Sequence, residues 1–504
     1  MALKKGEIYT GYVESIGFPN KGNIYVTDEE GERHKVTVKN ALPGQKVSFR
    51  LTKKRSGNSE GLLKEVLEKS EYETETVCRN AGKCGGCLYP GFSYDKTLEI
   101  KEAQVKKLLE NYLSDDVIYD GIKGSPLCDG YRGKMEYTFG DEYRDGPKVL
   151  GLHKRGGFYD IVDASDCRIA DEDYGKLVSH TSRFFAERGV EFYHRMKHTG
   201  VLRHLLVRKA TKTGELMAAL VTVSGNDKTS GLDAEQIDNL CNEWKDSLLS
   251  LEFKGTLTGV LHIVNDSQAD AIICDKMDAL WGKDWFTEEL LGLKFKITPF
   301  SFFQTNSRGA EVLYSLVRTY IQEDVKGGKV FDLYSGTGTI AQILAPSAGK
   351  VTGVEIVEEA VEAAKENAKL NGLDNCDFIA GDVFKVLESY ADSLDSPDCI
   401  ILDPPRDGVG AKALPRILNY GVDHIVYVSC KPTSLARDME IIEAKGYRIS
   451  RWGMVDMFPF TGNIEVCCLL EQLRSAKEHI EITIDAEDYY RIKESDKKSG
   501  KAYG

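Results

Sequence analysis

Cys430 is the residue of this chain whose type and position most directly suggest chemistry. It closes the apolar run "HIVYVS" and is followed by Lys431 and by a pattern that starts a helix at Thr433 or Ser434. A neighbouring cation and a helix N-terminus both lower the pKa of a thiol and raise its thiolate fraction. An inert, buried cysteine is the alternative, but packing does not require a thiol at the end of a strand. We therefore predict that Cys430 is a nucleophile.

A nucleophile of this kind needs a base, and Glu465 is the side chain that we predict for this role. It lies in "FPFTGNIEVCC", at the start of the last apolar run. His424 is the alternative base, but it opens the strand that Cys430 closes and is expected at the opposite end. Asp403 closes the preceding strand in "ILDPPRDG". Ligands of open α/β sheets bind beyond the carboxyl ends of the strands, so Asp403 and Cys430 are expected to face one crevice.

A glycine-rich turn in "DLYSGTGTI" is typical of a nucleotide-like cofactor site. Gly336 and Gly338 let a ligand approach the backbone, and Glu355 ends the next strand, where an acid binds ribose hydroxyls. Asp382 follows the third strand and is predicted to recognise an adenine ring. The alternatives are a solvated strand end for Glu355 and a helix N-cap for Asp382. Because Ile340 and Ala341 occupy the place of the third glycine of a dinucleotide fingerprint, S-adenosylmethionine (SAM) suits the site better than NAD.

A thiolate, a carboxylate base and a methyl donor together suggest one reaction. C5 of uracil is a poor nucleophile, but addition of the Cys430 thiolate to C6 makes an enolate whose C5 attacks the methyl group of SAM. Glu465 then removes the C5 proton, and elimination frees the cysteine. A base in folded RNA must first be splayed out to reach such a pocket.

The elements that must position these residues form a repeated series of strand, turn and helix after Lys294. Strand patterns such as "KVFDLY", "KVTGVEIV" and "DHIVYVSC" alternate with helical patterns such as "EEAVEAAKENAKLNGL". Such a series predicts a doubly wound, Rossmann-like parallel sheet. We therefore predict an α/β multidomain protein whose SAM-dependent methyltransferase domain covers residues 293–470.

Two further domains are predicted before this sheet, because 504 residues are too many for one hydrophobic core. Residues 1–66 consist of short strand patterns separated by Gly, Pro and Asn, which predicts a small β-barrel of the OB type. Residues 67–292 mix helical and strand patterns and are predicted to form a central α+β domain. Residues 471–504 are a charged tail to which we assign no role.

Composition favours a cytoplasmic protein with no membrane partner. Hydrophobic residues make up 41% of the chain, without an apolar run of membrane-spanning length, and "MALKKGEIYTG" lacks the apolar segment of a signal peptide. The twelve cysteines are then expected to be reduced. We also expect a monomer.

The net charge of −13 argues against a nucleic-acid partner, but two segments carry the opposite charge. Residues 1–66 hold more Lys and Arg than Asp and Glu, and the stretch "HRMKHTGVLRHLLVRKATK", residues 194–212, contains no acid. A basic stripe neutralises phosphates, whereas a solvated face is the simpler interpretation.

Five motifs resemble those of one known family, and they occur in the same order. "FSFFQTN", "DLYSGTGTI", "ILDPPR", "SCKPTSLARD" and "FPFTGNIE" are similar to the motifs of the bacterial RNA uracil-5-methyltransferases, and the similarity covers residues 1–470. The resemblance implies that Cys430 is the nucleophile and Glu465 the proton acceptor. It also implies that the N-terminal barrel is a TRAM domain, an RNA-binding relative of the OB fold. The SAM contacts that it implies are Gln304, Tyr334, Glu355, Asp382 and Asp403.

One departure from the family concerns the segment before the predicted base. Many members carry histidines between the proline and the glutamate, where this chain has Phe460, Thr461, Gly462, Asn463 and Ile464. The segment therefore lacks the histidines that stand beside the glutamate in those members.

Three cysteines in "CRNAGKCGGC" form a metal-binding pattern that lacks a fourth ligand. Cys78, Cys84 and Cys87 have the spacing C-x5-C-x2-C, which does not distinguish zinc from iron–sulfur. The pattern resembles the ribosomal-RNA branch of the family, which binds a [4Fe–4S] cluster. That resemblance implies Cys167 in "ASDCRIA" as the fourth ligand, with Cys128 as the competing candidate.

The cluster motif favours 23S ribosomal RNA as the substrate, because the tRNA branch of the family lacks it, although some relatives with the motif modify other RNAs. A non-catalytic iron–sulfur RNA-binding protein is one alternative, and a radical-SAM enzyme is disfavoured because no C-x3-C-x2-C motif is present. A 5-methylcytosine enzyme would carry a second cysteine where Arg406 stands.

Overall fold

The computed structural model of the chain describes residues 3–54, 59–76, 78–157, 159–226, 230–321, 326–390 and 397–473. Residues 1–472 form one compact unit. The predicted tail, residues 471–504, lies outside the described residues from residue 474 onward. Among the helices that are described, none combines the length and the apolarity needed to cross a membrane.

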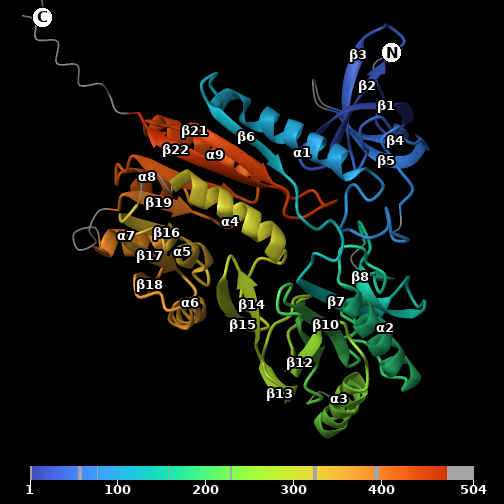
Figure 1. The fold of residues 1–504 in the computed structure, drawn as a ribbon. Coiled ribbons are helices and arrows are strands. Elements are labelled where there is room, and N and C mark those ends of the chain that lie inside the picture. The colour runs from blue at the N-terminus through green and yellow to red at the C-terminus, as the bar shows by residue number, and fades with distance from the viewer. Residues whose placement is uncertain are drawn as a thin grey trace, which may run out of the picture. The chain divides into compact units, whose positions relative to one another are not determined.

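A closed barrel with the strand order β1-β2-β3-β5-β4 forms the N-terminal part of the chain, as predicted (Figure 1). Its strands are β1 (Ile8–Gly17), β2 (Lys21–Thr27), β3 (Arg33–Lys39), β4 (Lys46–Lys53) and β5 (Ser59–Glu68). In β4 the buried Val47, Phe49 and Leu51 alternate with more exposed residues. Successive side chains of a strand point to opposite faces, so these three fill the interior of the barrel.

A second sheet, with the order β13-β12-β11-β10-β7-β8-β9, lies in the middle of the chain. Its strands are β7 (Lys134–Asp141), β8 (Lys148–His153), β9 (Ile161–Asp163), β10 (Leu202–Lys209), β11 (Glu215–Thr222), β12 (Thr256–Val264) and β13 (Lys276–Gly282). Helices α2 (Glu172–Glu187) and α3 (Ala234–Leu249) pack on it, and the Trp244 indole donates to Thr181 Oγ1 at 3.0 Å between them. The hairpin β14 (Phe286–Leu290) and β15 (Leu293–Ile297) follows this sheet.

The C-terminal sheet has the order β18-β17-β16-β19-β20-β22-β21-β6. Its strands are β6 (Ile118–Lys123), β16 (Lys329–Leu333), β17 (Lys350–Glu355), β18 (Cys376–Ala380), β19 (Cys399–Leu402), β20 (His424–Ser429), β21 (Tyr447–Val455) and β22 (Glu465–Gln472). Strands β16 to β20 are parallel, and β22 runs antiparallel to β20 and β21. The predicted doubly wound sheet is therefore present.

Helices cover both faces of this sheet. One face packs against α4 (Ser307–Ile321), α5 (Thr339–Leu344) and α6 (Glu358–Leu370), and the other against α7 (Val383–Tyr390), α8 (Ala413–Leu418) and α9 (Pro432–Ala444). The strand order reverses between β16 and β19. Such a switch point is where open α/β sheets bind ligands. The loops after β16, β19 and β20 therefore belong to the candidate site.

Two elements from the predicted central domain join the C-terminal sheet instead. Strand β6 pairs with β21, and α1 (Tyr94–Leu109), which continues into the short helix η1 (Glu110–Tyr112), packs beside α9 (Figure 1). Strand β6 contains no fully buried residue, so its sequence lacks the apolar alternation that would have assigned it to a sheet. The boundaries at residues 67 and 292 remain predictions.

Candidate active site

Cys430 and Glu465 are brought together by the pairing of β20 with β22. Ser429 lies opposite Val466 in this antiparallel ladder. Continuing the register by one residue makes Cys430 and Glu465 cross-strand neighbours at the carboxyl end of β20. Glu465 is 4% exposed and Cys430 is half-buried. The two residues predicted to be nucleophile and base are therefore adjacent, 35 positions apart in the sequence.

The charges around Cys430 contradict the predicted low pKa of its thiol. Burial, and after it the carboxylates of Glu465 and Asp403, raise the pKa of Cys430 to about 11. Burial, and after it Asp403, also raise the pKa of Glu465 to about 8. Arg406 opposes both shifts. The prediction is wrong because desolvation and two nearby carboxylates outweigh the helix N-terminus.

The cation that faces the thiol is Arg406 and not the predicted Lys431. The Lys431 ammonium is 44% exposed and lies 3.9 Å from Oδ1 of Asp407. Helix α9 begins at Pro432, slightly earlier than predicted, and the Ser434 hydroxyl donates to the Arg406 carbonyl at 2.7 Å. This hydrogen bond ties the start of α9 to the loop after β19. The sequence offered no sign of this role for Arg406.

Tyr314 of α4 connects three of the predicted positions. Its side chain is 3% exposed and forms a hydrogen bond with Gln304. Burial raises the pKa of Tyr314 well above its usual value, and the charges of Asp403 and Glu465 raise it further. Burial also raises the pKa of Asp403 to about 7. Gln304, Asp403 and Glu465 therefore surround one tyrosine, although their roles remain predictions.

The loop after β16 has a geometry that fits a cofactor such as SAM. Gly336 and Gly338 adopt left-handed φ angles of 54° and 70°. A Cβ atom at Gly336 would have one neighbour within 4 Å, Cδ1 of Phe302 at 3.9 Å, so this backbone borders open space. Oε2 of Glu355 accepts a hydrogen bond from the Gly336 amide at 3.0 Å, and Oδ1 of the buried Asp332 has no partner among the described atoms. The open space beside Gly336 is the feature that leaves room for a ligand at this loop.

Tyr334 and Asp382 lie close together on the same side of this loop. Tyr334 has a φ of 68°, an unfavourable angle for a tyrosine that tends to occur at functional sites. Burial, and after it the charge of Asp382, raise its pKa to about 12. Oδ1 of Asp382 accepts from the Lys385 amide at 3.1 Å, so the residue caps α7, the alternative role that its sequence position suggested. Its contact with an adenine ring remains a prediction.

The basic stretch over residues 194–212 contains two buried arginines, so it is not simply a charged outer face. Arg208 is 3% exposed and donates to the carbonyls of Thr298 and Ser301 at 2.7 and 2.8 Å. These carbonyls lie just before Gln304, so Arg208 fixes the loop that carries this predicted SAM contact. Arg203, 4% exposed, caps a different loop near residue 267. Sequence reasoning missed both roles because it treated the arginines as solvent-exposed.

The four predicted cluster ligands lie together beside β8 and β9. Burial, and after it the sulfurs of Cys167, Cys84 and Cys78, raise the pKa of Cys87 to about 12. The Gly86 amide donates to Cys84 Sγ at 3.3 Å. Cys128 interacts instead with charges that include Asp129. The structure therefore brings Cys167 to the three cysteines of the motif.

The spacing of these sulfurs bears on the kind of metal centre that they fit. In the part of the chain that the structure describes, no three cysteine sulfurs lie within 4.8 Å of one another. Four thiolates on one zinc ion, with Zn–S bonds of about 2.3 Å, would lie about 3.8 Å apart. A set of four thiols supplies the thiolate ligands that either an iron–sulfur cluster or a zinc ion takes.

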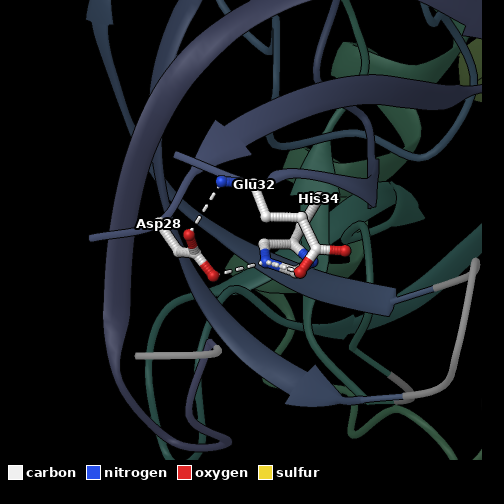
Figure 2. Close-up of side chains that lie close together, drawn as sticks. All are labelled: Asp28, Glu32 and His34. Carbon is white, nitrogen blue, oxygen red and sulfur yellow. Dashed lines mark hydrogen bonds and ion pairs between the residues drawn. The ribbon is translucent and has the colours of Figure 1, made fainter. Parts of the chain in front are cut away.

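A separate cluster of possible metal ligands lies on the barrel (Figure 2). Oδ2 of Asp28 lies 2.8 Å from Nε2 of His34, and its Oδ1 accepts from the Glu32 amide at 2.9 Å. Oε2 of Glu32 lies 3.8 Å from the same histidine nitrogen. These contacts close the turn between β2 and β3. We therefore interpret the cluster as a set of contacts that stabilises the β2–β3 hairpin.

Comparison with known proteins reveals extended similarity. Residues 220–473 match the family model described as tRNA (uracil-5-)-methyltransferase. The chain is 46% identical over 465 residues to an uncharacterized RNA methyltransferase of Clostridium tetani. The aligned region covers 92% of this chain and 98% of the relative. A relative with the same description from Caldanaerobacter subterraneus subsp. tengcongensis is 46% identical and covers 93% of this chain and 100% of its own.

A solved structure shares the fold over nearly the whole chain. It is the Pyrococcus abyssi tRNA (uracil-54, C5)-methyltransferase in complex with S-adenosyl-L-homocysteine. The TM-score is 0.69 at 25% sequence identity, and the match covers 92% of this chain and 100% of the other.

Proposed function

Because the chain belongs to the tRNA (uracil-5-)-methyltransferase family, we propose that it methylates C5 of a uridine in 23S ribosomal RNA through a covalent adduct with Cys430. Family membership makes it an RNA uracil-5-methyltransferase that takes its methyl group from SAM. The target RNA, the adduct and the roles of single residues are our proposal.

The observation that carries this proposal is the register of β20 and β22. It sets the thiol of Cys430 beside the carboxyl of Glu465, at the carboxyl end of β20 and close to the charge of Asp403. A thiol and a carboxyl at one sheet edge are what addition to a pyrimidine and later proton removal require. Packing alone gives no reason to bury Glu465 at this position, because burial raises its pKa.

Cys430 acts first by adding to the ring. Its sulfur bonds to C6 of uracil, and the electron pair of the C5–C6 double bond moves onto C5 and the C4 carbonyl. When bound, SAM supplies the electrophilic methyl group that C5 attacks. The charge of Arg406, which opposes the rise in the pKa of Cys430, favours the thiolate that makes this addition.

Glu465 completes the reaction by taking the proton from C5. The electron pair of the C–H bond re-forms the C5–C6 double bond as the bond from C6 to sulfur breaks, which releases the cysteine as a thiolate. A carboxylate whose pKa is raised to about 8 is a stronger base than an ordinary glutamate near neutral pH. Burial of Glu465 therefore serves the chemistry.

The residues that would hold SAM surround the loop after β16. Gln304 and Asp403 lie near Tyr314 and Glu465, whereas Tyr334 lies near Asp382. Glu355 accepts from the Gly336 amide in the glycine-rich turn. We assign recognition of the adenine ring to the neighbourhood of Asp382. The open backbone at Gly336 supports a ligand site at this loop.

A [4Fe–4S] cluster held by Cys78, Cys84, Cys87 and Cys167 is the part of the proposal that favours ribosomal RNA, since the resemblance links this motif to the ribosomal branch. The gathering of the four thiols at one place supports a metal centre there. Anaerobically purified protein should contain iron and sulfide, and Cys84→Ser should lose both. Protein that contains zinc and no iron would overturn the cluster assignment.

The barrel of residues 1–66 is assigned to RNA binding as a TRAM domain. An RNA substrate and reduced cluster ligands both suit a cytoplasmic enzyme, and we propose that it acts as a monomer.

The substrate is tested by mapping 5-methyluridine in 23S ribosomal RNA and tRNA from cells with and without this protein. The proposal expects one or more uridines of 23S RNA to lose the mark. Loss confined to tRNA would support the second candidate, a tRNA substrate, which the solved tRNA (uracil-54, C5)-methyltransferase of similar fold favours. Unchanged methylation in both RNAs would refute the ribosomal assignment.

A further inference from the structure

The segment that leads into Glu465 receives its polar support from distant parts of the chain. Residues 456–464 connect β21 to β22 without regular secondary structure, and Phe460 has a φ of 63°. The phenol of Tyr131 donates to the Pro459 carbonyl at 3.0 Å, and the Asn306 amide donates to the Met457 carbonyl at 2.7 Å. Each of these contacts fixes one point of the segment.

Lys101 of α1 is different because it holds both ends of this segment. Its ammonium donates to Oδ1 of Asp456 at 2.7 Å, to the Asn463 carbonyl at 2.9 Å and to the Phe458 carbonyl at 3.3 Å. Asp456 begins the segment, and Asn463 lies two residues before Glu465. One charged group with three donors therefore closes the loop into a fixed shape.

The surroundings of Lys101 show that stability is a poor explanation for this ion pair. Lys101 is 1% exposed and Asp456 is fully buried. Burial lowers the pKa of Lys101, and the Asp456 carboxylate opposes that shift. Replacement of a buried ion pair by apolar residues is often neutral or stabilising. The pair is better explained by the geometry that it imposes on the backbone around it.

The nucleophile is positioned without any of these contacts. Cys430 follows β20 and precedes α9, and the loop beside it is tied by the Ser434 hydroxyl. A change at Lys101 therefore disturbs the base and leaves the thiol in place. This separation makes the two roles distinguishable by experiment.

We propose that Lys101 is a positioning residue for Glu465, which holds the segment 456–464 so that the carboxylate reaches the C5 proton. The proposal rests on the proposed function, because it assumes that Glu465 is the base. Lys101 adds a contact from a distant helix to the local hydrogen bonds of Asp456 and Thr461 within the segment.

The test compares Lys101→Met with Lys107→Met on the same helix. The side chain of Lys107 is 77% exposed and pairs with Glu110 on the surface, so its variant controls for the loss of a lysine from α1. For Lys101→Met we expect turnover to fall about 100-fold, because small misplacement of a catalytic group has effects of this size. The KM values for SAM and RNA should stay within about twofold of wild type, since the affected step follows binding.

The diagnostic readout is a methylated protein–RNA adduct on a denaturing gel, with Glu465→Gln run beside it. Lys101→Met should accumulate the adduct, because Cys430 still adds and proton removal is slow. Loss of stability alone would lower the amount of active enzyme without accumulating adduct. Turnover of Lys101→Met equal to that of Lys107→Met, or slow turnover without adduct, would overturn the proposal.

A double variant, Lys101→Met with Asp456→Leu, guards against misfolding because it removes both buried charges. It should fold and still accumulate the adduct, whereas wild-type turnover in this variant would overturn the positioning role. If Glu465→Gln accumulates adduct and the Lys101 variants do not, the positioning role of Lys101 is refuted and the assignment of Glu465 as base stands. If Glu465→Gln itself accumulates none, the base assignment fails, and the positioning proposal fails with it.

Discussion

The segment that carries Cys430 and the segment that carries Glu465 reach the same site by different means. Cys430 lies between a buried strand and a helix that begins two residues later, so its neighbours in the sequence place it. Glu465 follows a loop that is held by Lys101, Tyr131 and Asn306, which lie more than 150 residues earlier.

This difference explains why the sequence predicts the role of Cys430 from its immediate neighbours but gives little local evidence for the role of Glu465. A strand that ends on a thiol is visible in a short window of sequence, whereas the apolar neighbours of Glu465 reveal nothing about a lysine 364 positions earlier. The electrostatics differ in the same way. Local features predicted a low pKa for Cys430, but burial, and after it the carboxyls of Glu465 and Asp403 from other strands, raise it.

Removal of the nucleophile should have the largest effect on activity. Cys430→Ala should reduce methylation to the detection limit, because no other described thiol shares this sheet edge, and SAM affinity should remain unchanged. Methyl transfer to RNA and calorimetric SAM binding measure the two effects. Cys399→Ala, in the neighbouring strand β19, is the matched control. Measurable turnover in Cys430→Ala would exclude the covalent route.

Removing the base should have the next largest effect. Glu465→Gln should lower turnover by about 10²- to 10⁴-fold, the usual contribution of general acid–base catalysis. The covalent adduct should accumulate after methyl transfer, which radiolabelled SAM and a denaturing gel detect. A variant that turns over slowly with no labelled adduct would assign proton removal to another group.

The loop that carries Gln304 is a third segment of the site, and like the loop before Glu465 it is held by a cation distant in the sequence, Arg208. Arg208→Met should weaken SAM binding about tenfold, because loss of one buried hydrogen bond to a charged group costs about 1.5 kcal/mol or more. Arg203→Met is the matched control, since this equally buried arginine caps a different loop. Equal SAM affinity in the two variants, measured by calorimetry, would contradict the role of Arg208.

The smallest expected effect is on stability, and it depends on pH. The pKa of Glu465 is raised from 4.5 to about 8 in the folded protein, so folding favours the protonated carboxyl. Its stabilising contribution is present below pH 4.5 and is lost as the pH rises toward 8. Glu465→Gln should therefore have a Tm a few degrees above that of wild type at pH 8, and the difference should shrink toward pH 5.

The control for this measurement is Glu471→Gln, which changes the same strand at a position with 38% side-chain exposure. It should not raise the Tm at pH 8, because a partly exposed carboxylate carries no comparable burial penalty. A lower Tm for Glu465→Gln than for wild type at pH 8 would contradict our expectation that the buried carboxylate of Glu465 destabilises the folded protein at this pH.

Much of the fold followed from patterns within single elements. The apolar strands and amphipathic helices after residue 294 predicted the doubly wound sheet, and the alternating strands of the first 66 residues predicted the barrel. Strand β6 and helix α1 could not be assigned to their sheet, because β6 lacks a buried face and α1 packs on a partner more than 300 residues away.

The sequence by itself determined which residues carry reactive groups and which ends of strands they occupy, because strand and helix periodicity are local properties of the chain. Tertiary structure alone decided the register that sets Glu465 beside Cys430, the cation that faces them and the lysine that holds the base loop. These depend on contacts between segments far apart in the chain, and on how much water those contacts exclude, which no short window of sequence contains.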